Sequence, residues 1–282
     1  MNFGSHMSIS GGIHKAVIRG KETGCDCIQI FTKNSNQWYA KEYATDEISL
    51  FKKLRDEYEI NPIIAHASYL INLASPDDSL YEKSINSFYE ELTRADLLDI
   101  PFIVIHPGSH RGSGEKEGLQ KVALAIDAIY EKGVNLKVQI LLETTAGQGT
   151  NLGYKFEQIA EIIDETKEKK KVGVCFDTAH SFCAGYDIRA PLSYKETFNQ
   201  FEKTIGAGKI KAIHLNDAKK GLGTRIDRHE HIGKGEIGLM GLKNLVNDER
   251  FEHIPMILET PKDKEMKWDK MNLKTLRELA VK

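Results

Sequence analysis

The segment Val172-Gly-Val-Cys-Phe-Asp177 is a short apolar run that stops on a carboxylate. Such a run is typical of a strand buried on both faces of a parallel sheet. The carboxyl ends of parallel strands meet on one face, so the residues that close several such runs are expected to gather there. Imidazoles and carboxylates in one place favour a divalent cation. Six runs of this kind close on His66, His106, Glu143, Asp177, His214 and Glu259.

Helical patterns alternate with these strands. A seventh apolar run, residues 27–31, ends on Thr32-Lys33-Asn34 instead of a ligand, and residues 2–4 supply a short first strand. About eight strand–helix units predict one domain over residues 1–282, a closed (β/α)8 TIM barrel with its active site at the C-terminal ends of the strands. The glycine-rich motifs of dinucleotide and phosphate-loop folds are absent from the sequence. The expected helices occupy residues 12–23, 46–58, 77–98, 116–132, 156–169, 194–205, 239–246 and 272–281.

Composition narrows the class of protein. A hydrophobic content of 40% supports a large core, and a formal net charge of -2 gives no global attraction to nucleic acid or membrane. The four cysteines form no CxxC pair and are expected to be reduced thiols. No apolar stretch approaches the ~20 residues of a membrane span, and the N-terminus lacks a signal-peptide pattern. We therefore expect a cytoplasmic protein with no membrane association, and take a monomer as its default state.

Two further segments extend the candidate metal site into loops. His180 follows Asp177 by three residues, and the two side chains need not face the same ion. In Asp227-Arg-His229, alternate residues of an extended loop point the same way, which favours a shared ion. His231 also alternates with His229, so spacing alone does not choose between these imidazoles. Several buried carboxylates and imidazoles are costly unless a cation pairs them, so the joint pattern predicts a metal site.

These segments closely resemble endonuclease IV, the zinc-dependent apurinic/apyrimidinic (AP) endonuclease family of base-excision repair. The resemblance runs in order along nearly the whole chain. The matching segments are Gly4-Ser-His-Met-Ser8, Phe31-Thr-Lys-Asn34, His66-Ala-Ser-Tyr-Leu-Ile-Asn-Leu73, His106-Pro-Gly-Ser-His110, Leu141-Leu-Glu-Thr-Thr-Ala-Gly-Gln-Gly149, Cys175-Phe-Asp-Thr-Ala-His180, His214-Leu-Asn-Asp217, Asp227-Arg-His229 and Ile257-Leu-Glu-Thr-Pro261.

The resemblance implies a barrel that holds three zinc ions, and it favours His229 over His231 as a ligand. These ligand types also tolerate manganese or iron at some positions. The family's ligands carry over onto nine positions, grouped by ion as His66, His106 and Glu143; Glu143, Asp177, His214 and Glu259; and His180, Asp227 and His229.

The implied reaction is hydrolysis of the phosphodiester 5′ to an abasic site in duplex DNA, which leaves a 3′-hydroxyl and a 5′-deoxyribose phosphate. Clustered cations generate hydroxide near neutral pH, neutralise phosphate oxygens and stabilise the leaving alkoxide. Glu143 would bridge two ions and Glu259 would orient the hydroxide, so both are expected to be catalytic. The family resemblance also allows 3′-phosphatase or 3′-phosphodiesterase activity.

The DNA contacts are expected on loops at the barrel mouth. Tyr69 matches the family's aromatic wedge on the loop after the third strand. The loop after the second strand carries Asn36 where an arginine is familiar, so that wedge is missing or altered. Basic residues on these loops are candidates for phosphate contacts. They are Lys33, Arg111, Lys219, Lys220, Arg225, Arg228 and Lys234.

Two other classes of protein fit part of the pattern. A metal-dependent sugar isomerase on the same kind of barrel also uses Glu, Asp and His at strand ends, with one or two ions, but needs neither Asp227-Arg-His229 nor Tyr69. A catalytically inactive nucleic-acid binder would keep zinc for structure alone. Structural zinc is usually closed by four ligands, often including Cys, so nine ligands in an open site favour the hydrolase.

Overall fold

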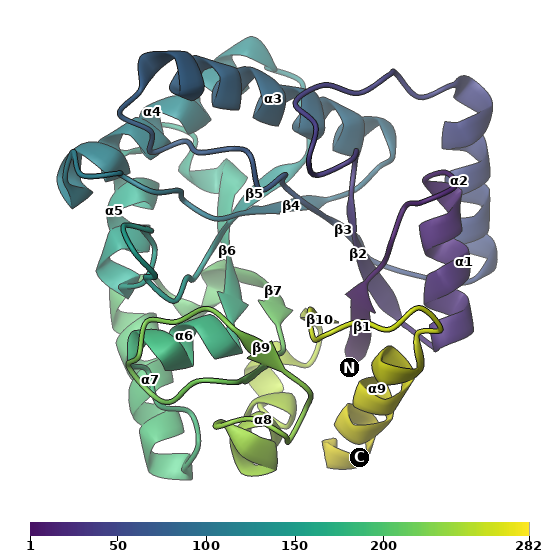
Figure 1. The fold of residues 1–282 in the computed structure, drawn as a ribbon, viewed down its shortest axis with the longest axis vertical. Coiled ribbons are helices and arrows are strands. Elements are labelled where there is room, and N and C mark those ends of the chain that lie inside the picture. The colour runs from purple at the N-terminus through teal and green to yellow at the C-terminus, as the bar shows by residue number, and fades with distance from the viewer. Residues whose placement is uncertain (282) are drawn as a thin grey trace.

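The structure, a computed structural model, describes residues 1–281 and contains a closed barrel of parallel strands. Within these residues the eight barrel strands neighbour one another in the order β1-β10-β7-β6-β5-β4-β3-β2 (Figure 1). The predicted (β/α)8 TIM barrel is therefore confirmed. The barrel strands are β1 (Asn2–His6), β2 (Cys27–Phe31), β3 (Ile63–His66), β4 (Phe102–Ile105), β5 (Gln139–Glu143), β6 (Val172–Asp177), β7 (Ile210–His214) and β10 (Pro255–Leu258).

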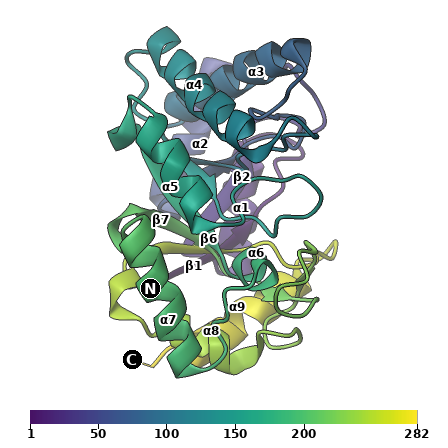
Figure 2. The ribbon, with the colours of Figure 1, turned by 90° about the vertical axis from the view of Figure 1, so that its left-hand side faces the viewer.

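Helices surround the barrel and connect successive strands (Figure 2). Each of the eight expected helices is present, and most boundaries agree with the expected ranges to within three residues. These helices are α1 (His14–Thr23), α2 (Thr45–Glu57), α3 (Asp78–Leu97), α4 (Glu115–Lys132), α5 (Phe156–Glu165), α7 (Pro191–Thr204), α8 (Gly238–Val246) and α9 (Lys267–Leu279).

Two helix boundaries differ from the expected ranges. Helix α5 ends at Glu165 because Thr166 has an extended backbone, and residues Lys169–Lys171 form a separate 3-10 turn. Helix α9 begins at Lys267, five residues earlier than expected. The Asp263 carboxylate accepts a hydrogen bond from the backbone N–H of Trp268 at 2.9 Å, which satisfies a donor at the start of that helix.

A ninth helix among the described residues, α6 (Thr178–Ala184), was missed because seven residues are too few to show a helical period. It follows β6 without an intervening loop. The Asp177 side chain caps it by accepting the backbone N–H of His180 at 2.7 Å. A strand-end carboxylate therefore starts the helix that carries the next candidate ligand.

The barrel interior below the mouth is a small apolar core. Its members point inward from seven strands and are fully buried: Cys27, Ile64, Val104, Leu141, Cys175, Ala212 and Ile257. A larger core lies between the strands and the outer helices. All four cysteines are buried free thiols. Within residues 1–281, no helix combines the length and apolar composition needed to cross a membrane.

Gly4 is expected to be essential for closing the barrel. A Cβ at this position would lie 1.8 Å from the backbone oxygen of Cys27 on the neighbouring strand, which cannot move without breaking the ladder. We expect Gly4→Ala to lower the free energy of unfolding by about 3 kcal/mol or more in urea titrations. Gly208→Ala is the control, because its new Cβ meets no atom within 4 Å. Equal stability of the two variants would contradict this account of closure.

Candidate metal centre

The candidate ligands lie one layer above the apolar core of the barrel. Side chains on a strand alternate between its faces, so a residue two positions beyond an inward-pointing core residue also points inward. His66 lies two positions beyond the core residue Ile64, and Glu143 lies two positions beyond Leu141. The same spacing relates the remaining candidates at strand ends to core residues, namely His106 to Val104, Asp177 to Cys175, His214 to Ala212 and Glu259 to Ile257.

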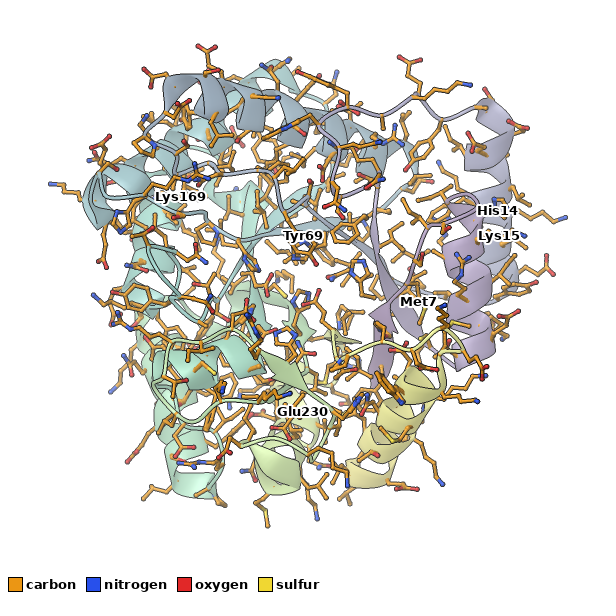
Figure 3. The ribbon with its side chains drawn as sticks, viewed as in Figure 1. Met7, His14, Lys15, Tyr69, Lys169 and Glu230 are labelled. Atoms are coloured by element: carbon orange, nitrogen blue, oxygen red, sulfur yellow. The ribbon has the colours of Figure 1, made fainter. Side chains whose placement is uncertain are left out.

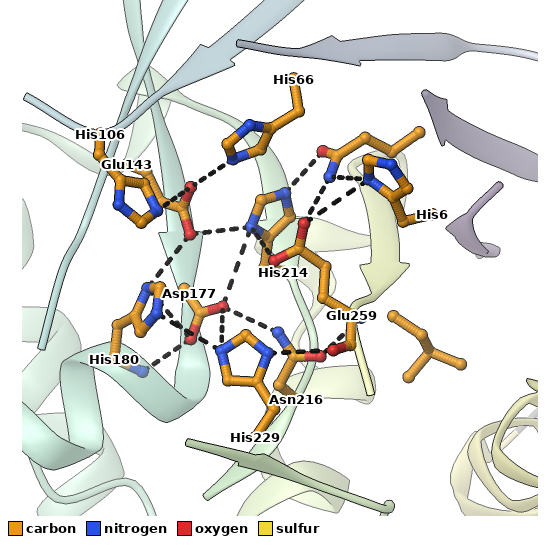
Figure 4. A network of polar contacts seen from close by, with 12 residues as sticks. His6, His66, His106, Glu143, Asp177, His180, His214, Asn216, His229 and Glu259 are labelled. Carbon is orange, nitrogen blue, oxygen red and sulfur yellow. Dashed lines mark hydrogen bonds and ion pairs between the residues drawn. The ribbon is translucent and has the colours of Figure 1, made fainter. Parts of the chain in front are cut away.

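Glu143 contacts four imidazoles of the cluster (Figure 4). Its Oε2 atom lies 3.2 Å from His66 Nε2 and 3.1 Å from His106 Nε2. Its Oε1 atom lies 3.1 Å from His180 Nδ1 and 3.0 Å from His214 Nδ1. Burial by itself raises the pKa of the Glu143 carboxyl, but the charges of His214 and His106 outweigh it and hold the pKa well below its usual value. The side chain is therefore a fully buried carboxylate. Each of its two oxygens faces a different pair of imidazoles.

Asp177 and Glu259 complete a second group around His214. The Nδ1 atom of His214 lies 3.2 Å from Glu259 Oε2 and 3.8 Å from Asp177 Oδ2. Burial raises the pKa of Glu259, but His214 overcomes this effect, and the resulting pKa is about 2. Asn216 holds both carboxylate residues, because its side-chain NH2 donates to Asp177 at 2.8 Å and its oxygen accepts from the Glu259 backbone at 2.7 Å.

His180, Asp227 and His229 form the part of the cluster that comes from loops. The Nε2 atom of His180 lies 3.1 Å from Asp227 Oδ1 and 3.4 Å from His229 Nε2. His229 Nε2 lies 3.7 Å from both Asp227 Oδ1 and Asp177 Oδ2. The antiparallel pair β8 (Asp217–Ala218) and β9 (His229–Glu230) fixes this loop, because Ala218 pairs with His229. Only one of these two Nε2 atoms needs to carry a proton for this contact, and a cation between the rings would take the place of that proton.

The donor set fits divalent cations. Ligand atoms within 4.8 Å of one another form three groups: His66, His106 and Glu143; Glu143, Asp177, His214 and Glu259; and Asp177, His180 and His229. The first two coincide with the expected ligand sets. The third contains Asp177, whereas the expected set has Asp227, whose oxygen lies near both imidazoles.

In two of the imidazoles, one ring nitrogen contacts a backbone carbonyl oxygen and the other faces the cluster. His66 Nδ1 lies 2.7 Å from the Ala67 carbonyl oxygen, and His229 Nδ1 lies 3.1 Å from the Glu259 carbonyl oxygen. In each ring this leaves Nε2 facing the carboxylates. Metal-binding histidines have the same arrangement, because a hydrogen bond from one nitrogen orients the other toward the ion.

Gln29 belongs to the site and was missed in the sequence. It lies two residues beyond Cys27 on the strand that ends without a ligand, and it points into the mouth. Its side-chain oxygen lies 2.7 Å from His214 Nε2, and its NH2 donates to Glu259 at 2.6 Å and lies 3.0 Å from His6 Nδ1. A glutamine inside the apolar run Cys27-Ile-Gln-Ile-Phe31 was the available signal. With His6 at the end of β1, each of the eight barrel strands now has a polar residue at the mouth, either in the strand or directly after it.

Of the expected DNA contacts, Tyr69, Asn36 and Arg228 are exposed at the mouth loops. Tyr69 is 70% exposed, and its ring stands edge-on to Phe31 at a centroid distance of 5.4 Å beside the barrel opening (Figure 3). The remaining basic candidates, Arg111, Lys219, Lys220, Arg225 and Lys234, are also exposed.

The expected phosphate contact of Lys33 is wrong. The residue is only 3% exposed, and its ammonium donates to Gln37 O, Trp38 O and Ser87 Oγ. A lysine on a polar loop resembles a surface charge in the sequence. Only the packing of the loop against α3 shows that this ammonium points into the protein.

Comparisons with known proteins place the chain in a family. Residues 18–279 match the family described as Xylose isomerase-like TIM barrel, which defines the class of protein. "Probable endonuclease 4" of Chloroflexus aurantiacus is 50% identical over 278 residues, with 99% of this chain and 98% of the relative covered. The protein of the same name from Chloroflexus aggregans is 51% identical, covering 99% and 97%. The chain therefore belongs to the endonuclease IV family, as the sequence resemblance implied.

Solved structures agree with this assignment. The crystal structure of endonuclease IV from Thermus thermophilus is 34% identical, covers 99% of this chain and is itself covered to 98%, with a TM-score of 0.88. A D-tagatose 3-epimerase-like protein shares the fold alone, at 22% identity and a TM-score of 0.75, covering 99% and 97%. The alternative of a sugar isomerase thus rests on the fold, whereas the endonuclease IV assignment rests on sequence as well.

Substitution of single histidines tests whether His229 or His231 is a metal ligand. His231 faces away from the cluster, with Nδ1 3.1 Å from Asn272 Nδ2 and its ring packed 5.0 Å from Trp268. We expect His229→Gln to lower the metal content by about one ion per chain, because a subsite loses a ligand. His231→Gln, the matched control, should keep the full content by elemental analysis. The opposite result would assign the ligand role to His231.

Proposed function

We propose that this chain is a metal-dependent AP endonuclease of base-excision DNA repair. It hydrolyses the phosphodiester 5′ to an abasic site in duplex DNA and leaves a 3′-hydroxyl and a 5′-deoxyribose phosphate. The observation that carries the proposal is the convergence of three ligand groups on one open barrel mouth, in a member of the endonuclease IV family. A cavity of about 320 Å³ opens above them, lined by candidate ligands together with Tyr69 and Lys262. An open site of this kind leaves room for a phosphodiester.

The nine ligands are proposed to hold three zinc ions, with manganese or iron accepted at some positions. Divalent cations in these groups would supply Lewis acidity and lower the pKa of water. Glu143 is placed to hold two ligand groups together because each of its oxygens faces a different pair of imidazoles.

Glu259 is proposed to orient the attacking water and accept its proton. Among the three carboxylates at strand ends, Glu143 and Asp177 have side chains with no exposed surface, whereas the Glu259 side chain is 18% exposed and lines the cavity. It is therefore the carboxylate of this group that a water in the cavity reaches. Gln29 donates to Glu259 Oε1 and leaves Oε2 facing His214 and the cluster.

The DNA side of the proposal rests on the loops around the mouth. Tyr69 presents an exposed aromatic ring next to the cavity, which suits stacking in the gap left by a missing base. Asn36 and Arg228 offer exposed polar groups on two other loops of the mouth. We also propose that residues 1–282 act as one domain, as a cytoplasmic monomer, with 3′-phosphatase or 3′-phosphodiesterase activity as secondary activities.

Incision of a defined substrate tests the proposed reaction. The metal-loaded protein should nick duplex DNA that carries a tetrahydrofuran abasic analogue, and mapping of the ends should give a 3′-hydroxyl. Chelation should abolish the reaction, and added zinc should restore it. Absence of incision by the fully loaded protein would overturn the proposal.

Glu259→Gln is expected to lower the incision rate by about 10²-fold or more, since the amide cannot accept a proton. Binding to abasic duplex should remain close to that of the wild type. Glu236→Gln makes the same chemical change on an exposed loop and should keep full activity. Near-normal turnover of the Glu259 variant would remove this residue from the mechanism.

Asn36→Arg is expected to tighten binding of abasic duplex, because it adds one cation to a loop at the mouth. The gain should shrink as the salt concentration rises. Asn199→Arg adds the same charge on the outer helix α7 and is the control. An unchanged dissociation constant for the Asn36 variant at matched salt would show that this position does not face DNA.

A further inference from the structure

Lys33 is a buried cation that organises the loop after β2. Its ammonium has three N–H donors, and all three are used, by Gln37 O at 2.9 Å, Trp38 O at 2.6 Å and Ser87 Oγ at 2.9 Å. Two of these acceptors belong to the backbone of the loop itself, four and five residues further on. Lys33 therefore folds the loop that carries Asn36 into a closed turn around its own charge.

Glu91 balances this charge from helix α3. Its Oε1 lies 3.3 Å from Lys33 Nζ, and both side chains are 1% exposed. Its Oε2 accepts the backbone N–H of Ser68 at 3.0 Å, immediately before Tyr69. One carboxylate thus touches the loop after β2 through one oxygen and the loop after β3 through the other.

Other groups on the same buried side of α3 hold the same two loops. Ser84 Oγ accepts the backbone N–H of Asn72, and Arg94 donates to the carbonyl oxygens of Thr32 and Lys41 at 2.9 Å each. We name this row the polar stripe of α3: Ser84, Ser87, Glu91 and Arg94, which are all buried. The two loops also touch directly, because Ser68 Oγ donates to the Ser35 carbonyl oxygen at 2.5 Å.

We infer that the Lys33–Glu91 pair is a positioning pair for DNA recognition, which fixes the Asn36 loop and the Tyr69 loop relative to each other. The inference rests on the proposed function, since it assigns those loops to the DNA. A buried ion pair is often no more stabilising than an apolar pair of similar size, so stability alone does not explain its presence. The geometry of its hydrogen bonds explains why the ion pair is present, because an apolar pair could not bind two loop carbonyls and a loop N–H at once.

The substitutions Lys33→Met and Glu91→Gln test this role. Each removes one charge while keeping a side chain of similar length. Both should raise the KM for abasic duplex by about tenfold or more, because an unpaired buried group displaces the loops. Saturated kcat and metal content should stay near wild-type values, because the metal ligands are not involved. Lys167→Met breaks an exposed ion pair with Glu131 and is the control expected to change neither constant.

A double-mutant cycle with Tyr69→Ala separates positioning from general destabilisation. If the pair acts through the Tyr69 loop, removal of Tyr69 should cost much less affinity in the Glu91→Gln background than in the wild type. Additive losses, or a fall in kcat and melting temperature without a change in KM, would overturn the inference.

A measurement without DNA keeps the test independent of the proposed reaction. The chain has two tryptophans, so a Trp268→Phe background leaves Trp38, on the Asn36 loop, as the sole tryptophan emitter. Acrylamide quenching of Trp38 should rise in Lys33→Met, in Glu91→Gln and in the milder Ser87→Ala, and not in Lys167→Met. Unchanged quenching in all three would show that the pair does not hold the loop. Failure of the wild type to incise DNA would instead refute the proposed function. The quenching of Trp38 would still report whether the pair holds the loop.

Discussion

The buried carboxylate of Glu143 is the constraint on which the site depends. An ionised group with no exposed surface persists in a barrel only if it is paired, and removal of its partners would leave a charge in an apolar interior. Four imidazoles lie within 3.2 Å of its two oxygens, and they come from β3, from β7, from α6 and from the residue after β4. Those elements must therefore hold their relative positions for the charge to be neutralised. The same requirement makes the cluster suitable for holding cations, since protons and metal ions compete for the same donors.

The barrel supplies these positions through the period of its strands. Side chains repeat every two residues, so an inward apolar residue such as Leu141 places Glu143 directly above the core. Closure of the sheet then brings strands that are far apart in the chain into one ring, and a residue such as Gln29 joins it from a strand that carries no ligand. The core below and the ligands above are consequences of one geometry. Changes to closure are expected to affect both.

The loops depend on supports outside the ring. Asp177 caps α6 and so sets the direction of His180, and the short β8–β9 ladder sets His229. On the opposite side of the mouth, the polar stripe of α3 holds the Asn36 and Tyr69 loops through Glu91 and its neighbours. The candidate metal ligands and the two loops that we propose to meet DNA therefore have separate supports.

Local patterns in the chain were enough to predict the class of fold and the types of candidate ligand, because strand and helix periods and the residues that end each apolar run are local properties. They also placed the family, since the matching segments run along nearly the whole chain. The direction in which a polar side chain points depends instead on contacts between distant parts of the chain. His231 and His229 are equivalent in spacing, yet only His229 faces the cluster. Lys33 has the pattern of a surface cation, yet it is buried against α3, because its partners Ser87 and Glu91 lie 54 and 58 residues away on a helix that the local sequence cannot bring near.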